Sequence, residues 1–405
     1  MRISLLFVLG IIMGVTLVAV AADWPHFRGI NGDAISTETG INKDWAATPP
    51  ITSWRVPVAD GGYSGPAVAG GIVYFIDYSR KSKEDVVRAI DLATGKDKWT
   101  VNYPDAVQEN YGYNRSTPAI DDGMLYYINS AGDVYCLKQA DGTLAWKKSL
   151  LADYGGQKLN FMFSMSPFID GNKLIIVPGG PNKAVVALDK KTGETIWMGG
   201  GSDKAGYATP TVATINGVKQ YVVITGANLI GVDAEKGTLL WSYPWPTQYD
   251  VNAPVPIIVG DSSIFITSGY NHGCALVDIK DGQATARWEN KEIASRMTTP
   301  LLIGGLLYCT TESGNVVCLD PATGKALWKK PGFEQGGLLA VDGAVIVVDG
   351  KNGDVALTTM NKEGYALLGK TSPFVGASNC WAPPIFADGF LIVRSKAELV
   401  CIKLK

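Results

Sequence analysis

The sequence predicts an all-β protein, a single β-propeller of eight four-stranded antiparallel blades. A segment that ends in Gly-x-x-x-Trp recurs about every 45 residues along the chain. Each interval holds four short runs of strand-forming residues separated by turn signals. The last interval lacks its fourth run, and a matching run stands near the N-terminus. The repeat therefore predicts a ring of blades, and the two ends of the chain predict how the ring closes.

The repeat has the form small-apolar-Asp-x-x-x-Gly-x-x-x-Trp, as in Ala89-Ile90-Asp91 with Gly95 and Trp99. The glycine supplies the positive φ that the tight turn into the last strand requires. The tryptophan buries a large indole, and the small residue that opens the motif leaves room for such a ring between blades. The tryptophans that mark the repeat are Trp54, Trp99, Trp146, Trp197, Trp241, Trp288 and Trp328. Two copies are degenerate, because Trp288 comes late and Leu368 stands where an eighth tryptophan is expected.

The two ends of the chain fit a closed ring. Runs 383–387, 390–395 and 399–403 form three strands, and the sequence stops before a fourth. Run 52–58, which contains Trp54, supplies it, so that pairing with the C-terminal blade removes two open sheet edges. A helical solenoid is the alternative, but no 3.6-residue periodicity accompanies the repeat. We expect the propeller to occupy residues 51–405.

The first residues are typical of a secretory signal peptide. A charged start, an apolar run over 3–18 and small residues over 19–22 predict cleavage near Ala21 or Ala22. We expect a signal peptide over 1–22, an extension over 23–50, and a periplasmic or secreted protein. An uncleaved anchor is the alternative, although the run is shorter than the ~20 residues of a spanning helix. No later apolar stretch is long enough, so we expect the mature chain not to span a membrane.

Charge and metal-binding residues exclude two classes of function. The net charge is −2 and no Lys/Arg run stands out, so we expect no nucleic-acid partner. The chain has only two histidines, His26 and His272, so we expect no metal site. No nucleophile elbow, phosphate loop or zincin helix occurs, and we predict no catalytic residue.

The six cysteines are interpreted first as packing residues. Cys136, Cys318 and Cys401 occupy the slot that other repeats fill with Ala or Gly, which indicates small core residues. Cys309 and Cys318 flank one turn, so a cross-strand disulfide between them is the alternative in an oxidising compartment.

The loops that lead into the blades are the best candidates for a functional site, because they converge around the propeller axis. They carry unlike residues, which a structural repeat does not require. The candidates are Tyr63, Tyr113, Asn114, Arg115, Met162, Phe163, Tyr207, Tyr249, Asp250, Asn252, Arg296, Gln335, Asn379 and Trp381. Such a funnel can bind a small anion, a sugar or an extended peptide. A wet channel mouth without a ligand is the alternative.

The signature Ala-x-Asp-x-x-Thr-Gly-x-x-x-Trp resembles the repeat of pyrroloquinoline-quinone (PQQ) enzymes over nearly all of residues 51–405. Residues 24–29, with Gly32, resemble the opening of PQQ-like propellers found among exported bacterial proteins. In one branch of this family, PQQ-dependent dehydrogenases hold calcium and the quinone in the central funnel beneath a disulfide of adjacent cysteines. The other branch resembles the propeller subunit of the outer-membrane β-barrel assembly machinery, a scaffold without a cofactor.

The resemblance favours the second branch, because no two cysteines are adjacent and no Cys-x-x-Cys-His occurs. It implies a non-enzymatic, monomeric scaffold or ligand-binding module with an envelope protein as partner and no cofactor. A PQQ-dependent dehydrogenase is the alternative. It implies that Trp381 stacks on the quinone, while Asp250 and Asn252 or Asn379 serve Ca²⁺ or proton abstraction. A carbohydrate-binding propeller is a third possibility.

Overall fold

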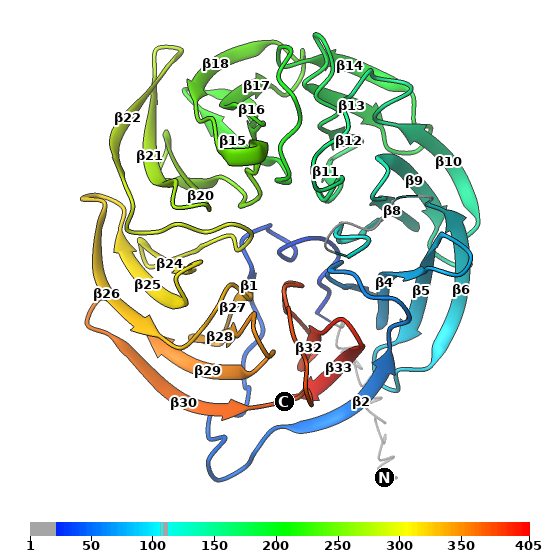
Figure 1. Ribbon diagram of the computed structural model, residues 1–405, viewed down its shortest axis with the longest axis vertical. Helices are drawn as coiled ribbons and strands as arrows, with labels where there is room; N and C mark the ends of the chain where they lie inside the picture. The colour runs from blue at the N-terminus through cyan, green and yellow to red at the C-terminus, as the bar shows by residue number, and fades with distance from the viewer. Residues whose placement is uncertain (1–21, 106, 108–111) are drawn as a thin grey trace, which may run out of the picture.

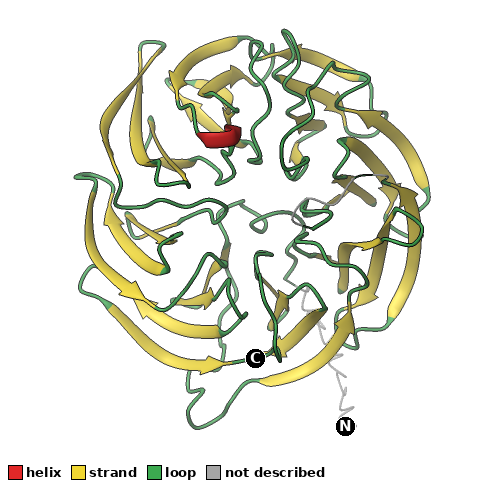
Figure 2. Ribbon diagram, in the orientation of Figure 1, coloured by secondary structure: helices red, strands yellow, loops and turns green. Residues whose placement is uncertain are grey.

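Eight sheets stand side by side in a ring (Figure 1). The computed structural model describes residues 22–105, 107 and 112–405, so the expected leader, except its last residue, lies outside the described residues. Within them the one helical element is the 3₁₀ helix η1 (Gln248–Asp250), and loops and strands make up the rest (Figure 2). The predicted all-β, eight-bladed propeller is confirmed.

Each blade is a meander whose first strand is innermost and whose last strand lies at the rim (Figure 1). Blades 1 and 2 are β3 (Ala67–Ala69), β4 (Ile72–Ser79), β5 (Glu84–Asp91), β6 (Asp97–Pro104) and β7 (Ala119–Asp121), β8 (Met124–Ile128), β9 (Asp133–Lys138), β10 (Leu144–Ser149). Blades 3 and 4 are β11 (Phe168–Asp170), β12 (Lys173–Ile176), β13 (Val185–Asp189), β14 (Thr195–Gly199) and β15 (Thr211–Ile215), β16 (Val218–Ile224), β17 (Asn228–Asp233), β18 (Leu239–Pro244). Blades 5 and 6 are β19 (Ile257–Val259), β20 (Ser263–Ser268), β21 (Gly273–Lys280), β22 (Gln283–Asn290) and β23 (Leu301–Ile303), β24 (Leu306–Thr310), β25 (Asn315–Asp320), β26 (Lys325–Pro331). Blade 7 is β27 (Leu338–Val341), β28 (Ala344–Val348), β29 (Val355–Met360) and β30 (Tyr365–Thr371).

Blade 8 joins the two ends of the chain. It contains β31 (Ile385–Ala387), β32 (Phe390–Arg394) and β33 (Glu398–Lys403), and its rim strand is β2 (Ile51–Pro57). β2 runs antiparallel to β33, with Trp54 opposite Cys401. The predicted closure is therefore confirmed. Blade 8 receives its rim strand from the N-terminal part of the chain, so the outer edge of β33 is paired.

Six of the seven repeated tryptophans join their blade to the next, whereas Trp241 donates to Gln220 of its own blade. The Trp54 indole N–H donates to the carbonyl oxygen of Leu92 at 2.7 Å, and that of Trp146 donates to Lys190 at 3.1 Å. Trp99, Trp197, Trp288 and Trp328 donate in the same way to the following blade. The ring also lies on the glycine of the next motif: a Cβ on Gly193 would stand 2.8 Å from the Trp146 ring. The motif glycine therefore provides a positive φ and also a flat contact.

An N-terminal strap, residues 23–45, ties distant blades together. Trp24 forms a bridge with Val68 of blade 1, and Pro25 accepts a hydrogen bond from Ile120 of blade 2. The strap then crosses the ring, drawn in blue in Figure 1, and β1 (Ile35–Ser36) adds a parallel fifth strand to blade 7. Asn42 donates through its backbone N–H to Leu404 in blade 8. The sequence did not predict this extra strand.

Arg28 anchors the middle of the strap. Its side chain is buried and donates to the carbonyl oxygens of Gly32 and Asp33 within the strap, and of Thr299 and Pro300 at blade 6. Burial lowers the pKa of Arg28 to about 10, so the guanidinium stays charged at neutral pH. Four carbonyl partners replace the water that burial removes from this charge.

The cysteines are small core residues, as the sequence predicts. All six are buried and none forms a disulfide. The alternative of a bond between Cys309 and Cys318 is wrong, because the register sets Cys309 opposite Val317 and Cys318 opposite Tyr308. Consecutive pairs in an antiparallel ladder point to opposite faces of the sheet, so the two sulfurs lie on different sides.

Along the stretches that the structure describes, no helix has the length and hydropathy needed to cross a membrane.

Candidate functional site

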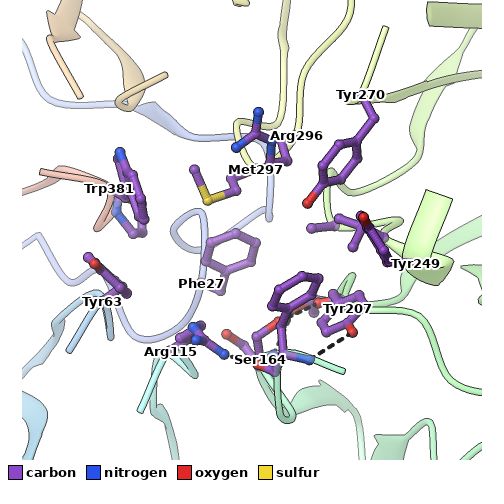
Figure 3. A pocket seen from close by; sticks show the side chains of 16 residues that line it. Phe27, Tyr63, Arg115, Ser164, Tyr207, Tyr249, Tyr270, Arg296, Met297 and Trp381 are labelled. Atoms are coloured by element: carbon purple, nitrogen blue, oxygen red, sulfur yellow. Dashed lines mark hydrogen bonds between the residues drawn. The ribbon is translucent and has the colours of Figure 1, made fainter. Parts of the chain in front are cut away.

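A cavity of about 500 Å³ opens where the loops between blades converge (Figure 3). Its wall comes from residues just before the first strands of seven blades, from one loop inside blade 5, and from the strap. The lining residues are Phe27, Tyr63, Arg115, Phe161, Ser164, Ser166, Tyr207, Thr209, Tyr249, Val251, Ala253, Tyr270, Arg296, Met297, Trp381 and Pro383. Its volume lies in the ordinary range of small-ligand sites. We call this cavity the funnel.

One side of the funnel is a row of four rings, the aromatic wall, formed by Tyr207, Phe161, Tyr249 and Tyr270. The ring centroid of Phe161 lies 6.3 Å from that of Tyr207 and 6.1 Å from that of Tyr249. The Tyr249 and Tyr270 centroids are 5.6 Å apart. The last two contacts are edge-to-face, with interplanar angles of 89° and 74°, which is a favourable arrangement for aromatic pairs. The wall is therefore corrugated.

The opposite side and the floor are also apolar. Tyr63 and Trp381 stand together with centroids 4.9 Å apart and planes tilted by 32°. Phe27 of the strap lies between the two sides, and Met297 lies beside it (Figure 3). The strap therefore does two things: it forms hydrogen bonds with several blades, and it places Phe27 at the centre of the funnel.

Two arginines stand on opposite sides of Phe27 (Figure 3). The Arg296 guanidinium lies over the Tyr270 ring at 4.8 Å and is 3.6 Å from the Glu312 carboxylate. Its Nε is buried without a hydrogen-bond partner among the described residues. Arg115 donates to the carbonyl oxygens of Phe161 and Gly112, and burial lowers its pKa. Both arginines fix the loops and bring positive charge to the funnel.

Several residues around the funnel hold a left-handed backbone. Met162, Tyr249, Asp250, Tyr270 and Asn379 have φ values of 64°, 61°, 59°, 56° and 54°. Asparagine and aspartate tolerate this region, but a large aromatic residue there is an outlier. Such outliers cluster at functional sites.

Six of the candidate residues line the funnel and the others do not. The first group is Tyr63, Arg115, Tyr207, Tyr249, Arg296 and Trp381. The second group is Tyr113, Asn114, Met162, Phe163, Asp250, Asn252, Gln335 and Asn379. Tyr113 stacks on Tyr78 at 3.5 Å, and Gln335 accepts the backbone N–H of Arg296. Through these contacts Tyr113 and Gln335 hold the loops around the funnel in place.

Two asparagines illustrate this supporting role. Asn252 is fully buried, donates to the carbonyl oxygens of Thr225 and Trp245, and accepts from Ser268. Asn114 is also buried, and its side chain accepts from the backbone N–H of Ser116. Every such bond holds one loop in place, so neither amide is directed at a ligand.

The sequence analysis missed Phe27, Phe161 and Tyr270, the residues that complete the aromatic surface. Tyr270 lies between β20 and β21, in a loop on the same face of the ring as those that lead into the blades. The meander itself supplies that signal, because alternate hairpin loops point to the same side of a propeller. Phe27 stands in a segment without a strand pattern, which gave no sign that it crosses the ring.

The residues present do not fit calcium and a quinone. Calcium takes six to eight oxygen ligands. Among the described residues no carboxylate lines the funnel, Asn252 is committed to loop contacts, and Asp250 faces Lys204 at 3.9 Å. In the described parts of the chain, no group of three or more His, Cys, Asp or Glu side chains is placed to hold a metal. Of the residues that the dehydrogenase alternative assigns to the quinone and calcium, Trp381 lines the funnel, whereas Asp250, Asn252 and Asn379 do not.

Comparison with known proteins places this geometry in a family. The outer membrane protein assembly factor BamB of Shewanella oneidensis is 25% identical over 57% of this chain, which spans 60% of that protein's length. A europium-containing methanol dehydrogenase superposes with a TM-score of 0.70 at 13% identity, covering 95% of this chain and 98% of the other. BamB from Moraxella catarrhalis superposes with a TM-score of 0.56 at 14% identity, covering 88% and 98%. These two likenesses show the fold.

The match of a family model carries more than these pairwise likenesses. The model described as outer membrane protein assembly factor BamB matches residues 50–159 and 82–330, which together cover more than half of the sequence. The matched region contains most of the tryptophan repeats and the aromatic wall. This chain therefore belongs to the BamB family of PQQ-like propellers.

Proposed function

We propose that this chain is an exported, non-enzymatic scaffold that binds another protein of the cell envelope. The leader predicted over residues 1–22 supports export, and membership of a family named for an assembly factor supports a role in binding. The observation that carries the proposal is the make-up of the funnel. It gathers Tyr, Trp, Phe, Met and Arg, the residue types enriched at the centres of protein interfaces.

The ring is suited to this role because it holds its loops rigidly. β2 and β33 close the sheet circle, and the strap bonds to blades 1, 2, 6, 7 and 8. Loops on a rigid support lose little conformational entropy when they bind, which favours affinity. We propose that the scaffold acts as a monomer.

The dehydrogenase alternative has less support. Its quinone would stack on Trp381 and its calcium would use Asp250 with Asn252 or Asn379, but only Trp381 lines the funnel. A reaction that removes a proton from an alcohol also needs a base within reach, and the part of the lining that the structure describes holds no carboxylate or histidine side chain.

Photo-cross-linking in the native cells tests the proposal. A photoreactive phenylalanine analogue replaces Tyr249 or Trp381 in the funnel, or Leu144 on rim strand β10 as the matched exposed control. We expect a discrete covalent product with one envelope protein from the funnel positions and none from Leu144. Absence of any product from the funnel positions, together with dye reduction after addition of PQQ and Ca²⁺, would favour the dehydrogenase instead.

A further inference from the structure

We propose that the funnel binds an extended segment of the partner protein that carries large apolar side chains on one face and carboxylates on the other. This inference rests on the proposed scaffold function and assigns the chemistry of what the scaffold holds. It assigns the aromatic wall as the surface that contacts successive apolar side chains of the segment, and Arg296 as the residue that contacts one of its carboxylates.

The spacing of the aromatic wall matches an extended chain. A β-strand rises about 3.3 Å per residue, so side chains on one face repeat about every 6.6 Å. The ring centroids of the wall are 6.3, 6.1 and 5.6 Å apart. Successive apolar side chains of an extended segment can therefore pack against successive rings of the wall, Tyr207, Phe161, Tyr249 and Tyr270.

The tilt of the rings favours a peptide over a carbohydrate. Phe161 and Tyr270 each meet Tyr249 nearly at right angles, so the wall presents edges and faces in alternation. A sugar ring stacks on a flat aromatic platform, which this row does not form. Alternating edges and faces instead form a ridged surface against which single side chains can pack.

Backbone strain supports a binding role for this wall. Tyr249 and Tyr270 both hold a left-handed conformation, which is strained for a residue with a side chain. Tyr249 is 51% exposed, so burial in the core does not compensate for that strain. A free-energy cost at an exposed ring is the pattern expected where the ring must be aimed at a ligand.

The charge of the funnel complements an acidic segment. Arg296 stands at the end of the wall, over the ring of Tyr270, and 40% of its side chain is exposed. Its Nε has no partner among the described residues, and Glu312, at 3.6 Å, is beyond ordinary hydrogen-bond distance from Nη2. An incoming carboxylate can pair with this guanidinium by charge-assisted hydrogen bonds. It meets no carboxylate in the described lining.

Direct binding measurements with synthetic peptides test the inference. The probes are end-blocked, fluorescein-labelled pentapeptides, titrated against the full mature chain by fluorescence anisotropy. We expect saturable binding of Phe-Asp-Phe-Asp-Phe. We expect at least tenfold weaker binding of Ser-Asp-Ser-Asp-Ser, which lacks the apolar groups, and of Phe-Lys-Phe-Lys-Phe, which reverses the charge.

Substitutions in the funnel locate the site. Tyr249→Asn and Tyr270→Asn remove a ring while asparagine keeps the left-handed backbone at little cost, so folding should be preserved. We expect each to weaken binding of Phe-Asp-Phe-Asp-Phe at least tenfold with a Tm no lower than that of the unchanged protein. Arg296→Gln should weaken binding of this peptide and should not weaken binding of the Phe-Lys-Phe-Lys-Phe probe. Leu144→Ser, on the exposed rim of β10, is the matched control and should change nothing.

Three results would overturn the inference. The first is no saturable binding of Phe-Asp-Phe-Asp-Phe. The second is binding that Leu144→Ser weakens and Tyr249→Asn does not, which would move the site to the rim. The third is tight binding of cellopentaose that displaces the peptide, which would make the funnel a carbohydrate site. If cross-linking still captures an envelope protein in any of these cases, the scaffold function stands and only the peptide chemistry fails.

Discussion

Asp85 and Asp105 form a buried acidic pair near the face of the ring that carries the funnel. Both side chains are almost completely removed from solvent. Burial raises the pKa of Asp105 to about 6, and burial together with the Asp105 charge raises the pKa of Asp85 well above its usual value. Since an aspartate of the unfolded chain titrates near 3.9, the folded protein holds protons that the unfolded protein releases.

This pair predicts a stability that falls as the pH rises. Its stabilising contribution is fully present below about pH 4, where both states are protonated, and is lost as the pH passes through about 6. We expect the free energy of unfolding to be about 1–3 kcal/mol higher at pH 5 than at pH 7.5. Asp105→Asn, which imitates the protonated acid, should reduce this difference and leave the part that the burial of Asp85 contributes. Urea unfolding at the two pH values measures it, and an equal difference in the variant would contradict the assignment.

The positions and roles of single residues were harder to predict from the sequence than the blades or the closure of the ring. Tyr249 and Trp381 could be named because they break the repeat in loops known to converge on the axis. Asp85 could not, because an aspartate at the start of a strand ordinarily faces solvent, and only the packed blades show that it is covered. Phe27 could not either, because its place in the funnel depends on where the strap crosses the ring.

The element that recurs is the pairing of a motif glycine with the tryptophan of the preceding blade, and it yields a matched test. Gly193 and Gly282 have φ values of 72° and 74°. A Cβ on Gly193 would lie 2.8 Å from the Trp146 ring, whereas one on Gly282 would meet nothing closer than 4.0 Å. Gly282→Ala should cost only the backbone strain, about 1 kcal/mol. Gly193→Ala should cost about 3 kcal/mol, because the indole must also move.

Equilibrium unfolding of the two variants in urea measures this difference. Equal losses of stability in the two variants would show that the tryptophan contact contributes nothing beyond the turn. The sequence predicted the positive φ and the burial of the indole, which are local properties. It did not predict the glycine as the surface beneath the ring, because Trp146 and Gly193 meet only through the angle between two adjacent blades.

At the scale of the whole molecule, the ring closes through β2 and the strap crosses the ring. The sequence predicted the first, because a missing strand at one end and a spare strand at the other have one simple solution. It did not predict the strap, whose contacts are single backbone and side-chain bonds spread over blades 1, 2, 6, 7 and 8. Such bonds leave no periodic pattern in a sequence, since each one depends on a different blade.

A disulfide across the closure should stabilise the whole ring. Ile51 and Lys403 are exposed partners in the β2–β33 register, so Ile51→Cys with Lys403→Cys disturbs no core residue. The bond would close a loop of about 350 residues, which predicts a gain of about 5–6 kcal/mol by loss of entropy in the unfolded chain. Thr359→Cys with Ala366→Cys, also exposed partners, closes only a hairpin and should gain about 2–3 kcal/mol. Urea unfolding with and without reductant measures both gains. If the closure disulfide gains no more than the hairpin one, separation of β2 from β33 is not part of the unfolding that limits stability.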